Sequence, residues 1–348
     1  MEMTTKVKEL ADILRNQNSS TEEVENSISR YYDEIEKTTD DEEVGKSMKH
    51  LSELFSFDNI ENGSIASLVC GSLIENGYPA KYITDDYIKF FNSGIKNSLP
   101  FIEVCETEIR KKNDEDYDDE IIEKTKGTFK SKFAKAIHCL EALDSYYPCG
   151  ISIFSSEKSE FEKGKNSLSG ISKYIKYNEA IHWMSKLFEV LFDEPIIAID
   201  LNTKKGIRGK ISGIVDNFQL QVLLMGLPEL NNKVSIHNRL LDVVKGLDVQ
   251  QLDKSVSGKW NMLNWECLKN KENNTSNYND SNYWIWSEGI PDDISKFKEY
   301  RVVLLDKPSY SRGISIQRTF KNLKAGIKVE ETLDKDQVEK LLNDFQRN

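Results

Sequence analysis

Apolar residues recur at helical spacing through about the first 145 residues, and the spacing changes after them. Val7, Leu10 and Leu14 lie three and four positions apart, which puts them on one face of a helix. Similar stripes follow, several of them behind Ser or acidic caps. Pro100 suits the first turn of a helix, so we expect a new helix to begin there. This half of the chain therefore predicts an irregular helical bundle.

The densest pattern spans residues 195–226, where the apolar spacing becomes that of strands. A short apolar run is followed by a polar turn at 202–206 and by a second run that ends at Val215. Two such runs around a turn that contains Gly predict a β-hairpin. Asp216 or Asn217 then caps a helix that ends before Gly-Pro punctuation, with a continuing strand as the alternative.

Further short apolar runs toward the C-terminus predict more strands. Together the two halves predict an α+β protein, in which an irregular N-terminal helical bundle precedes a mostly antiparallel sheet domain with a few helices. We assign residues 1–150 to the helical domain. The Ser- and Gly-containing residues 151–177 form a linker-like segment, and residues 178–348 form the α+β domain with Trp-rich strands.

Charge narrows the choice of partner. The chain of 348 residues has a formal net charge of −11. Proteins that bind nucleic acid draw much of their affinity from basic residues that neutralise phosphates, so this composition disfavours a nucleic-acid partner and favours a protein with a basic surface. The strongest acidic run, residues 113–120, lacks the Gly and Glu that a calcium-binding loop requires, and we interpret it as a solvated loop between helices.

Cysteine usage points to a reducing compartment. The five Cys residues are odd in number and irregularly spaced, without a CxxC pair, which argues against a disulfide framework or a zinc site. The N-terminus lacks the apolar core of a signal peptide, and no apolar run is long enough to span a membrane. We therefore expect a cytoplasmic protein without a membrane segment, metal or cofactor.

Tryptophan supplies the first candidate ligand site. Trp265, Trp284 and Trp286 flank an Asn-rich segment, and Asn264 adjoins the first of them. Aromatic rings with polar neighbours could hold a sugar, a base or a peptide. The alternative is packing, because the two-residue alternation of a strand places Trp284 and Trp286 on one face of a sheet.

Charged and amide residues extend this candidate site. Asp216 and Glu288 could form a carboxylate pair for acid–base chemistry, with Asn217 sharing the same turn. Capping of a helix is the alternative role for Asp216. Arg301 and Arg312 belong to a set of arginines that could form an anion pocket, with exposed strand positions as the alternative.

Two functions remain open at this level. The first is a protein-interaction module of unknown partner, of which an acidic inhibitor or immunity-type protein would be one form. The alternative is an enzyme or small-ligand-binding protein with a Trp-lined pocket in the C-terminal domain. No sequence motif identifies a catalytic residue, so the sequence leaves enzymatic activity undecided.

Overall fold

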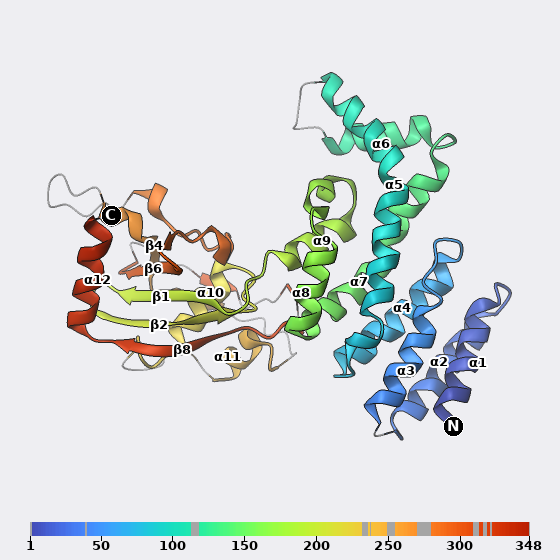
Figure 1. The fold of residues 1–348 in the computed structure, drawn as a ribbon, viewed down its shortest axis with the longest axis horizontal. Coiled ribbons are helices and arrows are strands. Elements are labelled where there is room, and N and C mark those ends of the chain that lie inside the picture. Colours follow the sequence, from blue (N-terminus) through green and yellow to red (C-terminus); the bar gives the residue numbers. More distant parts are fainter. Residues whose placement is uncertain are drawn as a thin grey trace. The chain divides into compact units, whose positions relative to one another are not determined.

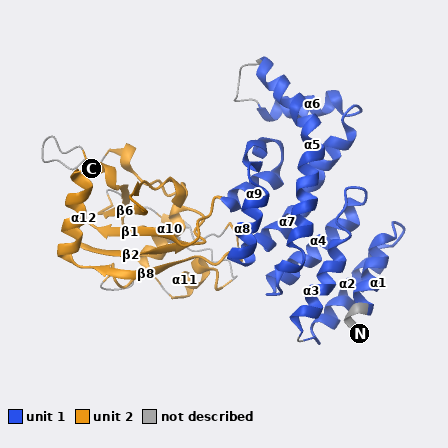
Figure 2. Ribbon diagram, viewed as in Figure 1, with its two compact units in different colours: residues 1–188 blue, residues 189–348 orange. Residues whose placement is uncertain are grey.

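The chain consists of two compact units, residues 1–188 and residues 189–348 (Figure 2). The first is helical, and the second is built on a six-stranded sheet (Figure 1), which confirms the α+β class. This computed structural model describes residues 2–38, 40–112, 118–231, 236, 238–248, 255–269, 280–308, 313–315, 319–320 and 322–347.

The division between the units follows Phe188, which lies beyond the linker-like segment predicted at 151–177. That segment is helical: it contains the end of α7 (Ala134–Ser156), all of α8 (Lys158–Ser167) and the 3-10 helix η3 (Ile171–Tyr177). Most of the Ser and Gly residues lie within these helices, because packing of an apolar stripe outweighs weak local propensity, while Gly170, with a φ of 80°, lies at the break between α8 and η3. The stripe is buried at Phe161, Leu168 and Ile171.

Helix α7 is central to the first unit, because α4, α5, α8 and α9 all pack against it. Its small residues Ala136, Ala142 and Gly150 are buried and allow these neighbours to approach closely. The other helices are α1 (Glu2–Arg15), α2 (Thr21–Ile35), α3 (Asp41–Ser52), α4 (Ile60–Glu75), η1 (Ala80–Tyr82), α5 (Thr84–Lys112), α6 (Asp118–Phe129) and α9 (Glu179–Phe188).

Pro100 lies in the interior of α5, so the prediction that a helix begins there is wrong. A proline inside a helix lacks one backbone N–H donor and typically costs about 3 kcal/mol. The residues that follow it, Phe101 and Ile102, are only 1% and 2% exposed. Burial of the apolar stripe on both sides of Pro100 compensates for that cost. This burial depends on neighbouring helices, so the residues next to Pro100 do not predict it.

The second unit contains a mixed, mostly antiparallel sheet. Its strands run in the order β4-β6-β1-β2-β8, and β5 pairs with the first two residues of β6. The predicted hairpin is present as an antiparallel β1/β2 pair, while β1 and β6 are parallel. The strands are β1 (Glu194–Asp200), β2 (Lys205–Ser212), β4 (Asn261–Asn264), β5 (Lys296–Phe297), β6 (Tyr300–Asp306) and β8 (Gly326–Leu333), and a separate pair joins β3 (Ser255–Ser257) to β7 (Gly313–Ser315).

Helices cover both faces of this sheet (Figure 1). Alternation along β1 sends Ile196 and Ala198 into the core beneath α10 (Asn217–Met225) and α11 (Asn238–Lys245). The intervening positions, Ile197 and Ile199, enter a second core. That core is closed by α12 (Lys335–Arg347), which buries Val338, Leu342 and Phe345, and by the 3-10 helix η4 (Trp265–Leu268).

The strand expected through Trp284 and Trp286 is not formed. The 3-10 helix η5 (Ser281–Tyr283) precedes these residues, and only a single bridge joins Trp284 to Leu263 of β4. The chain then turns toward the start of α10, whose first backbone N–H groups bind its carbonyl oxygens. These bonds take the place of a sheet ladder, so strand alternation does not set the directions of the two Trp side chains.

Candidate functional site

The polar corner at Asp216 and Asn217 holds the start of α10. Asp216 caps the helix, and its Oδ1 accepts from the backbone N–H of Gln219 at 2.7 Å. The backbone N–H groups of Asn217 and Phe218 donate to the carbonyl oxygens of Gly289 and Ser287 at 2.9 and 3.0 Å. The helix cap predicted at Asp216 is therefore confirmed, and the chain's own oxygens occupy this helix N-terminus.

The Asn217 side chain fastens the same loop. It is 1% exposed, and its Nδ2 donates to the carbonyl oxygens of Trp286 at 2.9 Å and Ile290 at 3.4 Å. Glu288 lies within this loop and is exposed. The structure thus brings Asp216 and Asn217 beside the segment that carries Trp286 and Glu288, through backbone bonds.

The three candidate Trp residues have different surroundings. Trp265 is 5% exposed and packs against Phe297 and Phe345, with ring centroids 5.1 and 5.8 Å apart. Trp284 and Trp286 are neighbours, with ring centroids 5.4 Å apart. Trp286 is 49% exposed, so one large aromatic ring is open to solvent. The packing alternative describes Trp265, while a ligand-binding role for the Trp284–Trp286 pair stays a prediction.

The remaining polar candidates are Asn264 and the arginines. Asn264 and Arg301 bind other groups of the protein. Asn264 Oδ1 accepts from the backbone N–H of Ser295 at 3.0 Å. Arg312 lies outside the described residues. Arg301 is 5% exposed, with Nε 2.9 Å from a Glu194 carboxylate oxygen and a second ion pair to Asp292. Its guanidinium is therefore bound within the protein and is not displayed to a ligand.

A cleft in the helical unit offers a different candidate site. It has a volume of about 320 Å³ and lies between α6, α7, η3 and the start of α9. We call it the acid-rimmed cleft. Its charged lining comprises Asp119, Glu123, Glu141, Asp144, Glu179, Lys126 and Lys176.

The floor of the acid-rimmed cleft is apolar. Phe101, Ile137 and Leu140 line it and are at most 4% exposed. Ile175 also lines it, yet this side chain is 44% exposed, an unusual position for a large aliphatic residue. A concave surface with an open apolar side chain and charged edges is typical of a binding site for another molecule.

Carboxylates outnumber ammonium groups around this cleft. Lys126 pairs with Glu141 and lies 3.7 Å from Glu123, while Lys176 lies 3.1 Å from Asp118. Partial burial raises the pKa of Asp144, although hydrogen bonds from the backbone of Ala180 and from Asn178 oppose that effect. With five carboxylates and two lysines in its lining, the cleft attracts cations.

A second cleft in the helical unit has a volume of about 610 Å³. It is formed by the end of α3, the connection to α4, one face of α5 and the start of α7. We call it the lysine–phenylalanine cleft, because Lys49, Lys89, Lys135, Phe55, Phe57 and Phe90 line it together with Ser52, Glu53, Ser56, Asp58, Asp86, Ser93, Asn97 and Cys139.

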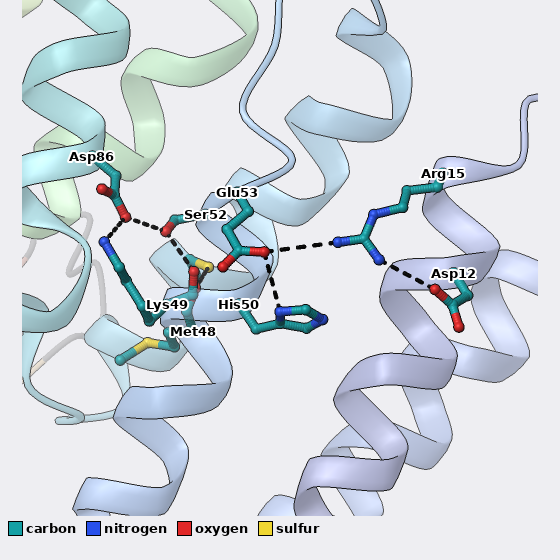
Figure 3. Close-up of polar contacts among 9 residues, drawn as sticks. Asp12, Arg15, Met48, Lys49, His50, Ser52, Glu53 and Asp86 are labelled. Atoms are coloured by element: carbon teal, nitrogen blue, oxygen red, sulfur yellow. Dashed lines mark hydrogen bonds and ion pairs between the residues drawn. The ribbon is translucent and has the colours of Figure 1, made fainter.

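Part of the charge in this second cleft is neutralised internally (Figure 3). Asp86 accepts from Lys49 and from Ser52 Oγ, the latter at 2.6 Å. Burial alone would raise the pKa of Asp86, but these two hydrogen bonds, with the charges of Lys49 and Lys89, lower it on balance. Glu53 points away toward Arg15 (Figure 3).

The described part of the chain was compared with what a metal site or a reactive cysteine requires. No grouping of three or more His, Cys, Asp or Glu residues there could hold a metal ion. The five cysteines are free and buried, and burial raises the pKa of the Cys139 thiol, which disfavours its nucleophilic thiolate form. Among the same residues, no helix has the length and apolar character needed to cross a membrane.

Sequence reasoning missed both clefts. The acidic positions of the first have helical spacing, since Asp119 and Glu123 are four apart and Glu141 and Asp144 are three apart. Such spacing is typical of any solvated helix face, and only the packing of α6 beside α7 makes it a rim. Comparison of the chain with protein-family models, curated proteins and solved structures gave no match.

Proposed function

We propose that this chain is a cytoplasmic protein-interaction module that receives a basic segment of a partner protein in the acid-rimmed cleft. The observation that carries the proposal is the open side chain of Ile175, 44% exposed on an apolar floor within a carboxylate-rich lining. An acidic inhibitor or immunity-type protein would act in this way. The formal charge of −11 adds a long-range attraction for such a partner.

The two parts of the cleft would serve different steps of binding. Exposed rim carboxylates such as Glu123 attract a basic partner and therefore act mainly on the association rate. Salt screens this attraction and weakens it. An apolar side chain of the partner would cover Ile175 and exclude water from it, which slows dissociation. The favoured segment therefore carries Arg or Lys next to a Leu or Ile residue.

The test uses a synthetic probe in place of the unidentified partner. A short peptide of alternating Leu and Arg is titrated into the full chain, with a Leu–Glu peptide of equal length as the reference. Calorimetry at low and physiological salt should show binding of the Leu–Arg peptide alone, weaker at higher salt. Equal affinity for both peptides would overturn the proposal.

Charge reversal then locates the site. We expect the double variant Glu123→Lys with Glu179→Lys to weaken binding about tenfold, because two attractive contacts become repulsive. The double variant Glu157→Lys with Glu162→Lys is the matched control, since both residues lie in or beside α8 of the same unit and outside the cleft lining. An equal loss in the control would mean that net charge, and not the cleft, governs binding.

A second candidate function uses the sheet unit. The exposed ring of Trp286 beside Trp284 supports an aromatic platform for a small ligand, either an enzyme's substrate or a bound molecule. Native mass spectrometry of the protein recovered from its own cells separates the two candidates. A bound small molecule that is lost in Trp286→Ala favours the platform, while a stoichiometric second protein that is lost in Ile175→Ser favours the acid-rimmed cleft.

A further inference from the structure

We propose that the lysine–phenylalanine cleft is a separate binding site for a small organic anion with a planar aromatic ring, the chemistry of a nucleoside monophosphate. The cleft shares no lining residue with the acid-rimmed cleft. Its volume of about 610 Å³ falls within the range of about 300–1,000 Å³ that small-molecule sites occupy. It combines an aromatic surface with two lysines, Lys89 and Lys135, that form no ion pair with a described carboxylate.

The aromatic surface is built from Phe57 and Phe90. Their rings are stacked with centroids 4.3 Å apart and planes 12° apart, and Phe55 meets Phe90 edge-on at 6.1 Å. Phe57 is half-buried, so part of its ring faces the cleft that it lines. A flat ring can extend this stack, because base–aromatic stacking needs only an accessible π-face.

The chain holds this surface in place before any ligand arrives. His138 Nε2 donates to the carbonyl oxygen of Phe57 at 2.8 Å, and Tyr146 OH donates to that of Ser56 at 2.8 Å. Gly94 leaves room for the Phe57 ring, because a Cβ at that position would lie 2.8 Å from the ring's Cζ. A preorganised ring costs little ordering entropy on binding, so the stack is available to a ligand.

The charge available to an anion comes from Lys89 and Lys135. Within the described residues, neither ammonium group has a carboxylate at ion-pair distance, whereas Lys49 is occupied by Asp86. The two lysines project from different helices, α5 and α7, and line one cleft. The cleft also has three carboxylates: Glu53 lies near Arg15, Asp86 is bound to Lys49 while the charge of Lys89 also acts on it, and the third is Asp58.

Polar side chains complete the wall beside the free lysines. Ser93 and Asn97 follow Lys89 at intervals of four residues, so the three share one face of α5 that lines the cleft. Hydroxyl and amide groups at this spacing can hydrogen-bond a ribose or the edge of a base. Two lysines for an anion, a fixed ring for stacking and a row of polar groups together match an aromatic anion better than a simple inorganic ion.

Calorimetry on the full chain tests this assignment with three probes. Adenosine monophosphate should bind at a single site, and adenosine and inorganic phosphate should each bind at least tenfold more weakly, because each offers only one of the two interactions. Absence of binding by adenosine monophosphate at millimolar concentration would overturn the proposal. Equal binding of inorganic phosphate would overturn the aromatic part of it.

Variants assign the binding to this cleft. The double variant Lys89→Ala with Lys135→Ala should weaken the binding of adenosine monophosphate at least tenfold, and Phe57→Leu should weaken it because the side chain stays apolar but loses its flat ring. The control is Lys96→Ala with Lys130→Ala, which removes two exposed lysines outside the lining. Circular dichroism verifies that every variant is folded. An equal loss in the control, or no loss in the Lys89 and Lys135 variant, would contradict the site.

Discussion

The two units of this protein use polar side chains in opposite ways. In the sheet unit, Asn217 and Arg301 are almost fully buried and bind the chain's own carbonyl and carboxylate oxygens. In the helical unit, charged side chains such as Glu123 and Lys89 are exposed and line concave surfaces. A segment rich in polar and aromatic residues can therefore stabilise the fold, while ordinary amphipathic helices can form the charged clefts.

Removal of Arg301 should have the largest effect on stability. Arg301→Met leaves the Glu194 carboxylate with Lys296 as its remaining cationic partner, and it removes bonds to the carbonyl oxygens of Asp292 and Ile294 at 2.7 and 2.8 Å. A hydrogen bond from a charged donor contributes about 1.5–3 kcal/mol, so the loss of these two bonds should cost about 3 kcal/mol or more. Urea unfolding followed by Trp fluorescence measures it, because four of the five Trp residues lie in the sheet unit.

The matched control for that experiment is Lys328→Met, an exposed position in β8. It should change the free energy of unfolding by less than about 0.5 kcal/mol. If Arg301→Met cost no more than this control, the polar groups of the sheet unit would not be structural, and the contrast between the two units would fail.

Asn217→Ala should give a smaller loss in the same unit. The variant removes the Nδ2 donor from the carbonyl oxygens of Trp286 and Ile290, and an unsatisfied buried group costs about 1–3 kcal/mol. Asn282→Ala, at an exposed position just before the same loop, is the control. Urea unfolding gives the energies. If Asn217→Ala instead lost ligand binding and kept its stability, Asn217 would be a binding residue and not a structural one.

Asp86→Asn should have the smallest effect, and that effect should depend on pH. The pKa of Asp86 lies below its ordinary value of 3.8, so the folded chain binds this proton less tightly than the unfolded chain does. The contribution to stability is therefore present above pH 3.8 and is lost as the pH falls through the folded pKa. Because the pair with Lys49 is partly exposed, we expect less than about 1 kcal/mol near neutral pH.

Helical circular dichroism during urea unfolding follows the unit that contains Asp86. The difference between the original chain and Asp86→Asn should shrink as the pH is lowered past 3.8, while Glu103→Gln, an exposed change on the same helix, should show no such trend. A difference that stays constant with pH would show that the carboxylate charge contributes nothing.

Local sequence patterns predicted correctly those elements whose structure depends on a few neighbouring residues. The β1/β2 hairpin follows from alternation around a turn at 202–206, and the cap at Asp216 follows from a side chain that reaches its own helix. Local patterns were wrong at Pro100 and at the Trp284–Trp286 strand. In both places distant residues supply the deciding contacts, namely the packing around α5 and the bonds to the start of α10.

The sequence by itself determined the α+β class, the succession of a helical half and a strand-rich half, and the acidic charge, because these depend on residue type and short-range spacing. Tertiary structure alone decided which polar groups are bound internally and which remain available. Asp119 and Glu141 line one cleft only because α6 lies near α7, and Lys89 and Lys135 line another only because α5 packs on α7. A helix sequence specifies its faces, but the neighbours of each face depend on long-range packing.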